Sequence, residues 1–364
     1  MIKNYQPDFE NLRRALKREG GPAKKMPFWE LFHDVQVMEH FLGEKMADRD
    51  ALVGAMNGDK DLMNTIIDQR IRVHLMLGYD YVPIPPLVPL TFTNRKSTEN
   101  TAEMAKGGER QWADESSSTI ANWEDFENYK WPTLAECNFR FIEEASKRVP
   151  EGMKIAVGTS GILENVQWLM GYEQMAYSIY DEPELIDALF DKIGPLFSSV
   201  YETAAQIDNV GLMAMGDDMG FNGGTLFSPD FLRKYVFPWQ KKCVESAHKH
   251  GHPFVLHTCG QVDAIMDDLI DYVGIDAKHS FEDIITPVEQ VHAKYHERVT
   301  LVGGVDIDLL ARGTQEQVRA RTRQILEACA HKGSYVMGTG NSVANYVNMD
   351  NYIAMMDETR KFVL

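Results

Sequence analysis

A histidine and a cysteine one residue apart, His257 and Cys259, are the residues whose types and spacing best fit metal chemistry. They follow the apolar run 253–256. If that run is a strand, alternate positions place both side chains on the same face. Imidazole and thiolate are ligands that zinc prefers, so the pair predicts the start of a zinc site. A catalytic zinc site takes three protein ligands, and a third must therefore come from elsewhere.

Two adjacent carboxylates, Asp217 and Asp218, follow another apolar run at 211–215 and are candidate catalytic residues. A carboxylate at a strand end can orient a ligand, take a proton or complete a metal shell. Because adjacent side chains on a strand face opposite ways, we expect only one of the two to enter the site. The other then has a capping or surface role, and the sequence leaves open which is which.

Further polar residues follow other predicted strands. His279 comes after the run 273–277 and is a third catalytic candidate, although a buried histidine held by hydrogen bonds is an equal alternative. His33, Glu164 and Asn341 stand after three other runs and are candidate substrate-binding residues. All of these residues are selected because each follows the end of a predicted strand.

The elements that would position these residues alternate between short β-like runs and helical patterns. Eight such runs, with helices between them, predict an α/β protein, and more closely a (β/α)8 TIM barrel. Active sites of such barrels lie at the carboxyl ends of the strands. The predicted strands are 26–31, 79–84, 154–158, 211–215, 253–257, 273–277, 299–302 and 334–337.

The length of the chain fits one barrel domain, covering residues 1–364, with helical patterns between the runs. A polar, Ser-rich segment at about 91–132 interrupts the alternation and is predicted to be an insertion after the second strand. It would be a lid or partner surface, or a hairpin that only covers the barrel. The main predicted helices are 61–77, 183–206, 229–250, 314–330 and 349–362, the third beginning at a Ser228 cap.

Composition excludes several classes of partner. The formal net charge of −17 disfavours nucleic acid, which requires clustered basic residues. No uninterrupted apolar run of the length of a membrane span and no secretory signal stand out, so we expect a cytoplasmic protein without a membrane partner. The four cysteines are widely spaced without a C-x-x-C pair, which fits a reducing compartment.

Taken together, the motifs resemble the uroporphyrinogen decarboxylase superfamily, and within it the corrinoid-dependent methyltransferases. The resemblance spans nearly the whole chain and implies the barrel inferred above. Its carriers are residues 26–30 (MPFWE), 77–81 (LGYDY), 227–229 (FSP), 257–260 (HTCG), 303–306 (GGVD) and 338–340 (GTG).

The resemblance also implies a zinc site. Methyltransferases of this branch hold zinc through a His-x-Cys pair, matched here by His257 and Cys259, and a later cysteine near the last strand. That later position falls on Thr339, which is a poor zinc ligand. If a metal is bound, we expect its third ligand among Glu164, Asp217 and Asp218.

The decarboxylase branch fits less well. Decarboxylases of the superfamily carry an arginine-rich segment after the first strand, which holds the substrate carboxylates. Here residues 30–36 read ELFHDVQ and contain no arginine. An acidic segment would repel a polycarboxylate substrate.

The leading hypothesis is therefore a zinc-dependent methyltransferase that moves a methyl group between a small methylated substrate and a corrinoid (cobalamin) carried by a separate protein. Replacement of a cysteine ligand by a harder one fits an O-methyl compound. The alternative enzyme is a metal-independent decarboxylase in which Asp217 or Asp218 stabilises a cationic intermediate. A third reading is a non-catalytic barrel that binds a corrinoid protein or a tetrapyrrole.

Overall fold

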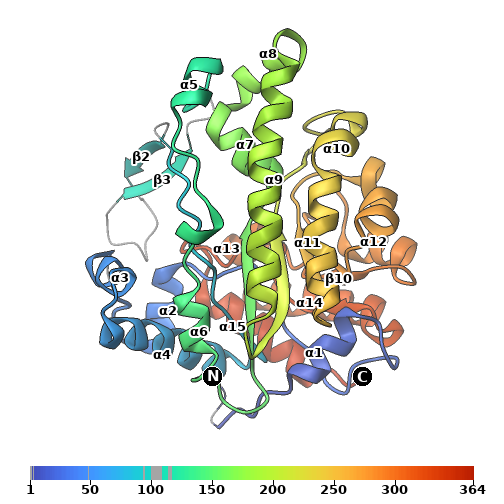
Figure 1. Cartoon of the computed structure of the whole chain (residues 1–364). Coiled ribbons are helices and arrows are strands. Elements are labelled where there is room, and N and C mark those ends of the chain that lie inside the picture. Colours follow the sequence, from blue (N-terminus) through green and yellow to red (C-terminus); the bar gives the residue numbers. More distant parts are fainter. Residues whose placement is uncertain (1, 3, 48, 93–94, 100–108, 114–116) are drawn as a thin grey trace.

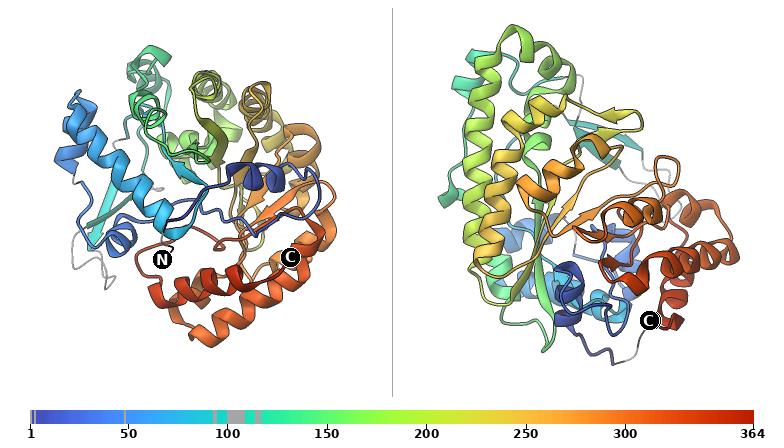
Figure 2. Two further views of the ribbon diagram at one scale, coloured as in Figure 1. Left: turned by 90° about the horizontal axis from the view of Figure 1, so that it is seen from below. Right: turned by 90° about the vertical axis from the view of Figure 1, so that its right-hand side faces the viewer.

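A curled sheet of seven parallel strands forms the centre of the molecule (Figures 1 and 2). The computed structural model describes residues 2, 4–47, 49–92, 95–99, 109–113 and 117–364. Every pair of neighbouring strands is parallel, so all their carboxyl ends meet at one end of the sheet. In sheet order the strands are β1 (Tyr81–Pro83), β4 (Lys154–Ser160), β5 (Val210–Gly216), β8 (Phe254–His257), β9 (Ala277–His279), β10 (Thr300–Val302) and β11 (Tyr335–Val336).

The predicted first strand closes the barrel without forming a regular strand. Phe28 makes a single parallel bridge to Met337, just beyond β11. On the other side, the gap to β1 is closed by a side chain. The Tyr81 hydroxyl accepts a hydrogen bond from the Glu30 backbone N–H (2.8 Å) and donates one to the Glu30 carbonyl (3.0 Å). We call this contact the tyrosine seam.

Helices surround the sheet (Figure 2). The long helix α9 packs against α11 on the outside, and α1 covers the end opposite the carboxyl ends of the strands (Figure 1). The helices are α1 (Phe9–Leu16), α2 (Val35–Leu42), α3 (Arg49–Met56), α4 (Lys60–Leu77), α5 (Trp123–Asn128), α6 (Arg140–Ala145), α7 (Ile162–Met170), α8 (Tyr172–Asp181), α9 (Pro183–Ala205), α10 (Pro229–Tyr235), α11 (Phe237–Lys249), α12 (Val288–Tyr295), α13 (Ile307–Arg312), α14 (Gln315–Cys329) and α15 (Met349–Lys361).

The α/β barrel architecture is confirmed, and two predicted boundaries are wrong. The sixth strand begins only at Ala277, because Asp268–Val273 form a π-helix that ends at Gly274 in the left-handed conformation. The predicted helix 229–250 is two helices that meet at Val236, since Pro238 lacks the N–H that would continue the first. The Ser228 cap is confirmed, as its side chain accepts from the Phe231 N–H.

The segment 91–132 lies between β1 and α6, as the predicted insertion requires. Its parts at 93–94, 100–108 and 114–116 lie outside the described residues, so the insertion boundaries and the single-domain assignment remain predictions. Two antiparallel pairs lie outside the main sheet: β2 (Arg95–Glu99) with β3 (Glu109–Ala113), and β6 (Gly220–Phe221) with β7 (Gly224–Thr225).

Within the described ranges, we find no helix that has both the length and the apolar character needed to cross a bilayer.

The tyrosine seam can be tested by stability. Tyr81→Phe removes one hydroxyl and leaves the buried N–H and C=O of Glu30 without their partner. We expect a loss of about 1–3 kcal/mol in the free energy of unfolding, measured by urea denaturation. Tyr180→Phe is the matched control, because Tyr180 is 84% exposed. Equal effects of the two substitutions would contradict a role for the seam.

Candidate metal centre

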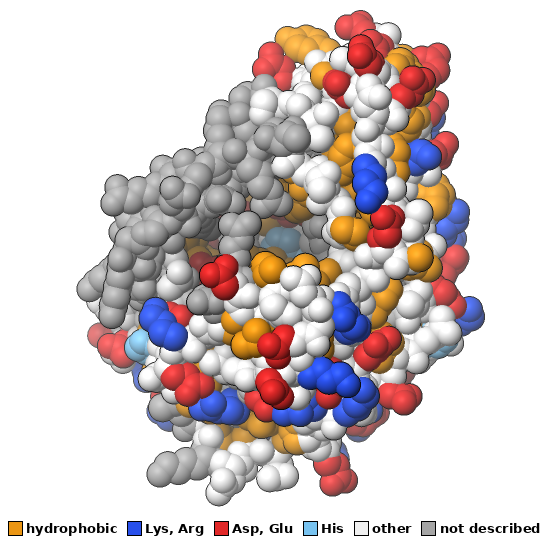
Figure 3. Space-filling view, turned by 60° about the vertical axis from the view of Figure 1, so that its left-hand side comes forward, with side chains coloured by type: hydrophobic (Ala, Val, Ile, Leu, Met, Phe, Trp, Pro, Cys, Tyr) orange, Lys and Arg blue, Asp and Glu red, His pale blue; other side chains and the backbone are white. Residues whose placement is uncertain are grey.

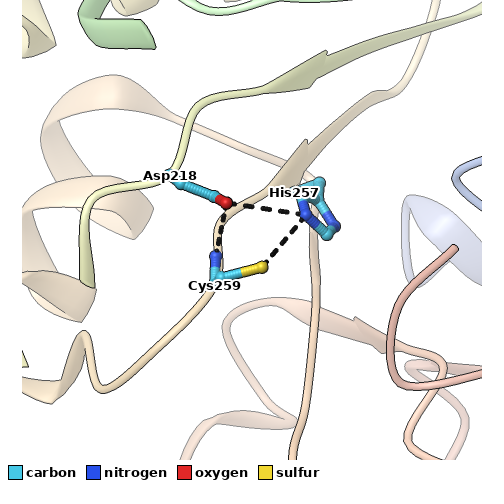
Figure 4. A group of neighbouring side chains, drawn as sticks. All are labelled: Asp218, His257 and Cys259. Carbon is cyan, nitrogen blue, oxygen red and sulfur yellow. Dashed lines mark hydrogen bonds and ion pairs between the residues drawn. The ribbon is translucent and has the colours of Figure 1, made fainter. Parts of the chain in front are cut away.

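Strand register brings three potential ligands together at the carboxyl ends of β5 and β8. Gly216 of β5 lies opposite His257 of β8. Asp218 and Cys259 each follow these residues by two positions, so they leave neighbouring strands at the same level. Figure 4 shows the three side chains converging on one point.

The distances within this group suit a metal ion. The ligand atoms of Asp218, His257 and Cys259 all lie within 4.8 Å of one another. Cys259 Sγ is 3.4 Å from His257 Nε2, which is 3.5 Å from Asp218 Oδ1. In the part of the chain that the structure describes, no other group of three His, Cys, Asp or Glu residues meets the same criterion. We call these residues the DHC group.

A chain of hydrogen bonds sets the tautomer of His257. The Thr339 carbonyl can only accept, so His279 Nε2 carries a proton and donates it (3.0 Å). Neutral His279 then accepts at Nδ1 from His257 Nδ1 (2.7 Å). Neutral His257 is left with its lone pair on Nε2, the atom that faces Cys259 and Asp218. This is how metal-binding histidines are usually oriented.

Burial keeps both rings neutral. It lowers the pKa of His257 to about 3, with Lys278 adding to the shift. It also lowers the pKa of His279 well below its usual value, helped by His257. A proton added to His279 would occupy the Nδ1 acceptor and break this chain, whereas a proton added to His257 would occupy the Nε2 lone pair. The neutral pair therefore keeps the Nε2 lone pair available across the physiological pH range.

The thiol of Cys259 is protonated in the absence of a cation. Burial, with Asp218 as the second cause, raises its pKa to about 12. Ser280 Oγ (3.4 Å) and Asn341 Nδ2 (3.3 Å) both lie at donor distance from its sulfur. These two donors suit a thiolate acceptor, so the sulfur is prepared for the charge that a bound cation would stabilise.

Asp217 binds the start of helix α7 and is not part of the DHC group. Its carboxylate accepts from the backbone N–H groups of Ile162, Leu163 and Glu164 at the start of α7, and from Gln240 Nε2. Gly161 permits this contact, because a Cβ there would lie 2.0 Å from the Asp217 Cγ. Of the paired aspartates, Asp218 thus lies in the DHC group and Asp217 does not, and the functional role of each stays a prediction.

The DHC group opens into a large cavity. Its volume is about 1170 Å³, and Asp218, His257 and Cys259 all contribute to its lining. Figure 3 shows a hollow on this side of the molecule with a histidine side chain inside it. The predicted substrate-binding residues His33, Glu164 and Asn341 all line the cavity. Neither His279 nor Asp217 is among the described lining residues; both lie behind it.

Glu164 lines the cavity near the carboxylates of Asp217 and Asp218, whose charges act on it. Burial raises its pKa well above the usual value, and the charges of Asp217 and Asp218 add to the shift. Burial therefore favours the protonated form of Glu164, which would present an O–H donor to the cavity.

Sequence reasoning assigned no function to a buried polar network on the opposite wall. The Thr339 N–H donates to both carboxylate oxygens of Glu30 at 3.1 Å, and the Thr339 hydroxyl lies 2.5 Å from Glu30 Oε2. The hydroxyl contact is what a threonine adds at the expected cysteine position. Burial raises the pKa of Glu30 to about 8. Next to the lining residue His33, the buried Tyr79 and Tyr352 share a hydrogen bond of 2.5 Å, and Tyr352 contacts His33 Nε2 at 3.0 Å. No local pattern distinguishes these tyrosines from core residues.

Potential nitrogen, sulfur and oxygen ligands at the carboxyl ends of a parallel barrel define a TIM-barrel protein with a candidate metal site. The sequence profile of the uroporphyrinogen decarboxylase (URO-D) family matches residues 112–362. The chain therefore belongs to the URO-D family, which confirms the resemblance seen in its motifs.

Curated relatives are methyltransferases. The chain is 25% identical to "Methylcobamide:CoM methyltransferase MtbA" of Methanosarcina acetivorans, over 90% of each chain. It is 26% identical to "Methylated-thiol--coenzyme M methyltransferase" of Methanosarcina mazei, over 64% of this chain and 62% of the relative. The match to a solved "methyltransferase from Methanosarcina mazei" has a TM-score of 0.71 at 18% identity, covering 97% of this chain and 98% of the other. That likeness supports the fold.

Zinc content is the first test of the DHC group. We expect about one zinc ion per chain in wild-type protein purified without chelator. Cys259→Ala should lose most of it, because two ligands remain. Cys137→Ala is the matched control, since Cys137 is also a free cysteine outside the group. Elemental analysis gives the content, and zinc retained by Cys259→Ala would rule out the thiol as a ligand.

Proton release tests the protonation states. The pKa of Cys259 is about 12 and that of His257 about 3, so the thiol is protonated and the imidazole neutral at pH 7. Zinc binding should then displace about one proton per ion, from sulfur alone. Calorimetric titration in two buffers of different ionisation enthalpy measures this number. Release of no proton, or of about two, would contradict the assignment.

Proposed function

We propose that this chain is a zinc-dependent methyltransferase that moves a methyl group between a small methylated substrate and the cobalt of a corrinoid carried by a separate protein. The observation that carries the proposal is the DHC group on the wall of the large cavity, with the His257 lone pair directed into it. The names of the curated relatives support both the reaction class and the corrinoid.

Asp218, His257 and Cys259 would hold the zinc, since one carboxylate oxygen, one neutral imidazole and one thiolate make a three-ligand catalytic set. When bound, zinc supplies a Lewis acid that polarises the heteroatom of the substrate. His279 acts as a positioning residue through its bond to His257. Ser280 and Asn341 donate to the sulfur and moderate its charge.

Glu164 is the proposed acid. Methyl transfer to cobalt(I) breaks the bond between the heteroatom and the methyl carbon, and that electron pair stays on the heteroatom. Cobalt(I) supplies the pair for the new bond to carbon. The departing heteroatom then needs a proton, which the protonated Glu164 can donate from the cavity wall.

The ligand set favours an oxygen-methyl donor. A carboxylate in place of a second thiolate leaves the zinc a harder acid, which suits an ether oxygen better than a thioether sulfur. The cavity volume of about 1170 Å³ also exceeds what a one-carbon compound would need. We therefore propose a methyl ether of larger size as the donor.

Methyl transfer itself is the test. Zinc-loaded full-length protein should methylate chemically reduced cob(I)alamin from one or more members of a panel of aryl methyl ethers, methylated thiols and methylamines. The absorbance change of cobalamin and chromatography of methylcobalamin measure the reaction. Glu164→Gln should slow it by roughly 10²–10⁴-fold with ether donors, because the acid is lost. Cys137→Ala should react like the wild type.

Two results would count against the proposal. One is the absence of methylcobalamin with every donor in the panel. The other is release of carbon dioxide from a small acid without corrinoid, which would favour the metal-independent decarboxylase.

A further inference from the structure

An arginine that has no anionic partner among the described residues lies on the wall of the same cavity. Arg70 belongs to α4, and its side chain lines the cavity. Across the described residues, it takes part in no ion pair and donates no side-chain hydrogen bond. Its helix neighbour Arg72 differs, because that guanidinium pairs with Glu44 at 2.9 Å. Burial lowers the pKa of Arg70, which reflects the cost of enclosing this charge without a counterion.

Packing ties Arg70 to the wall of the site. Its carbonyl accepts from His74 Nδ1 (2.8 Å) one helical turn away. The His74 ring lies edge to face with the ring of His33, 5.5 Å between centroids. His33 and Arg70 both line the cavity that also contains the DHC group. A ligand can therefore contact the guanidinium and the DHC group without leaving the cavity.

Charge on the cavity wall makes Arg70 distinctive. It is the one lysine or arginine among the described lining residues, whereas several lining residues are acidic. An anionic group placed elsewhere in the cavity would approach the carboxylates of Asp34, Glu136 and Asp218. Among the lining side chains, Arg70 is thus the place that favours an anion, and its guanidinium can bind a carboxylate through two parallel hydrogen bonds.

The remaining wall is largely apolar. Phe92 and Trp168 line it with their rings edge to face, 6.0 Å between centroids. Pro85, Leu87 and Val88 contribute further apolar surface. Such a wall suits a flat hydrocarbon body between two polar ends.

From these observations we infer that the methyl donor is a carboxylate-bearing compound, such as a methoxybenzoate, whose carboxylate pairs with Arg70 while its methylated oxygen faces the DHC group. This inference rests on the proposed function and names its substrate class. Arg70 is then a specificity residue, because it distinguishes charged donors from neutral ones of the same shape.

Binding of matched probes tests the inference without corrinoid or turnover. The probes are 4-methoxybenzoate and its neutral analogue 4-methoxybenzamide, titrated into the zinc-loaded full chain by calorimetry. Wild type should prefer the carboxylate by roughly 10- to 100-fold, the range expected for a charge-assisted contact. Arg70→Gln should abolish this preference, and Arg70→Lys should keep part of it. Arg72→Gln, on the same helix, should leave it unchanged.

Equal binding of the two probes by wild type, or an unchanged preference in Arg70→Gln, would overturn the inference. Failure of wild type to bind either probe would also overturn it. The readout separates this inference from the proposed function. Arg70-dependent binding without any methyl transfer would leave the anion site intact and refute the reaction. Methyl transfer from neutral donors that is unaffected by Arg70→Gln would support the reaction and refute the anion site.

Discussion

The hydrogen bond between two buried imidazoles, His257 and His279, is the contact on which the site depends. A pair of neutral rings can share one proton between facing Nδ1 atoms in either direction. Here the direction is set from outside, because the Thr339 carbonyl accepts from the far side of His279. The lone pair at the other end then emerges at His257 Nε2, beside a thiol and a carboxylate.

That contact is itself a product of the parallel sheet. His257 and His279 are register partners on β8 and β9, so their side chains leave the sheet on the same face. Gly303 keeps this space open, since its φ is +84° and a Cβ would lie 2.9 Å from the His279 ring. The edge of Trp29 packs on the same ring, 4.8 Å between centroids. The backbone and one aromatic side chain therefore confine the His279 ring in addition to its hydrogen bonds.

The sequence alone led to the barrel and to the strand exits, because alternation of short apolar runs with helical patterns is a local signal. It predicted His257 and Cys259 from their spacing. It could not choose between Asp217 and Asp218, since the choice depends on the register of β5 against β8, and register is not local. Arg70 and the Tyr79–Tyr352 contact were missed for a related reason. They depend on packing between segments that are distant in sequence, and only the folded barrel places Arg70 on the cavity wall and Tyr79 against Tyr352.

The tyrosine seam has a consequence for the size of the barrel. Ladder hydrogen bonds hold neighbouring strands about 4.8 Å apart, whatever their side chains are. Between the segment around Glu30 and β1, a phenol ring takes the place of those bonds, and it is longer than the contact it replaces. The distance between β1 and the segment around Glu30 is thus set by one side chain, Tyr81. Glu30, Tyr81 and Pro83 all line the cavity. A single substitution at Tyr81 can therefore change the width of the barrel within the same fold.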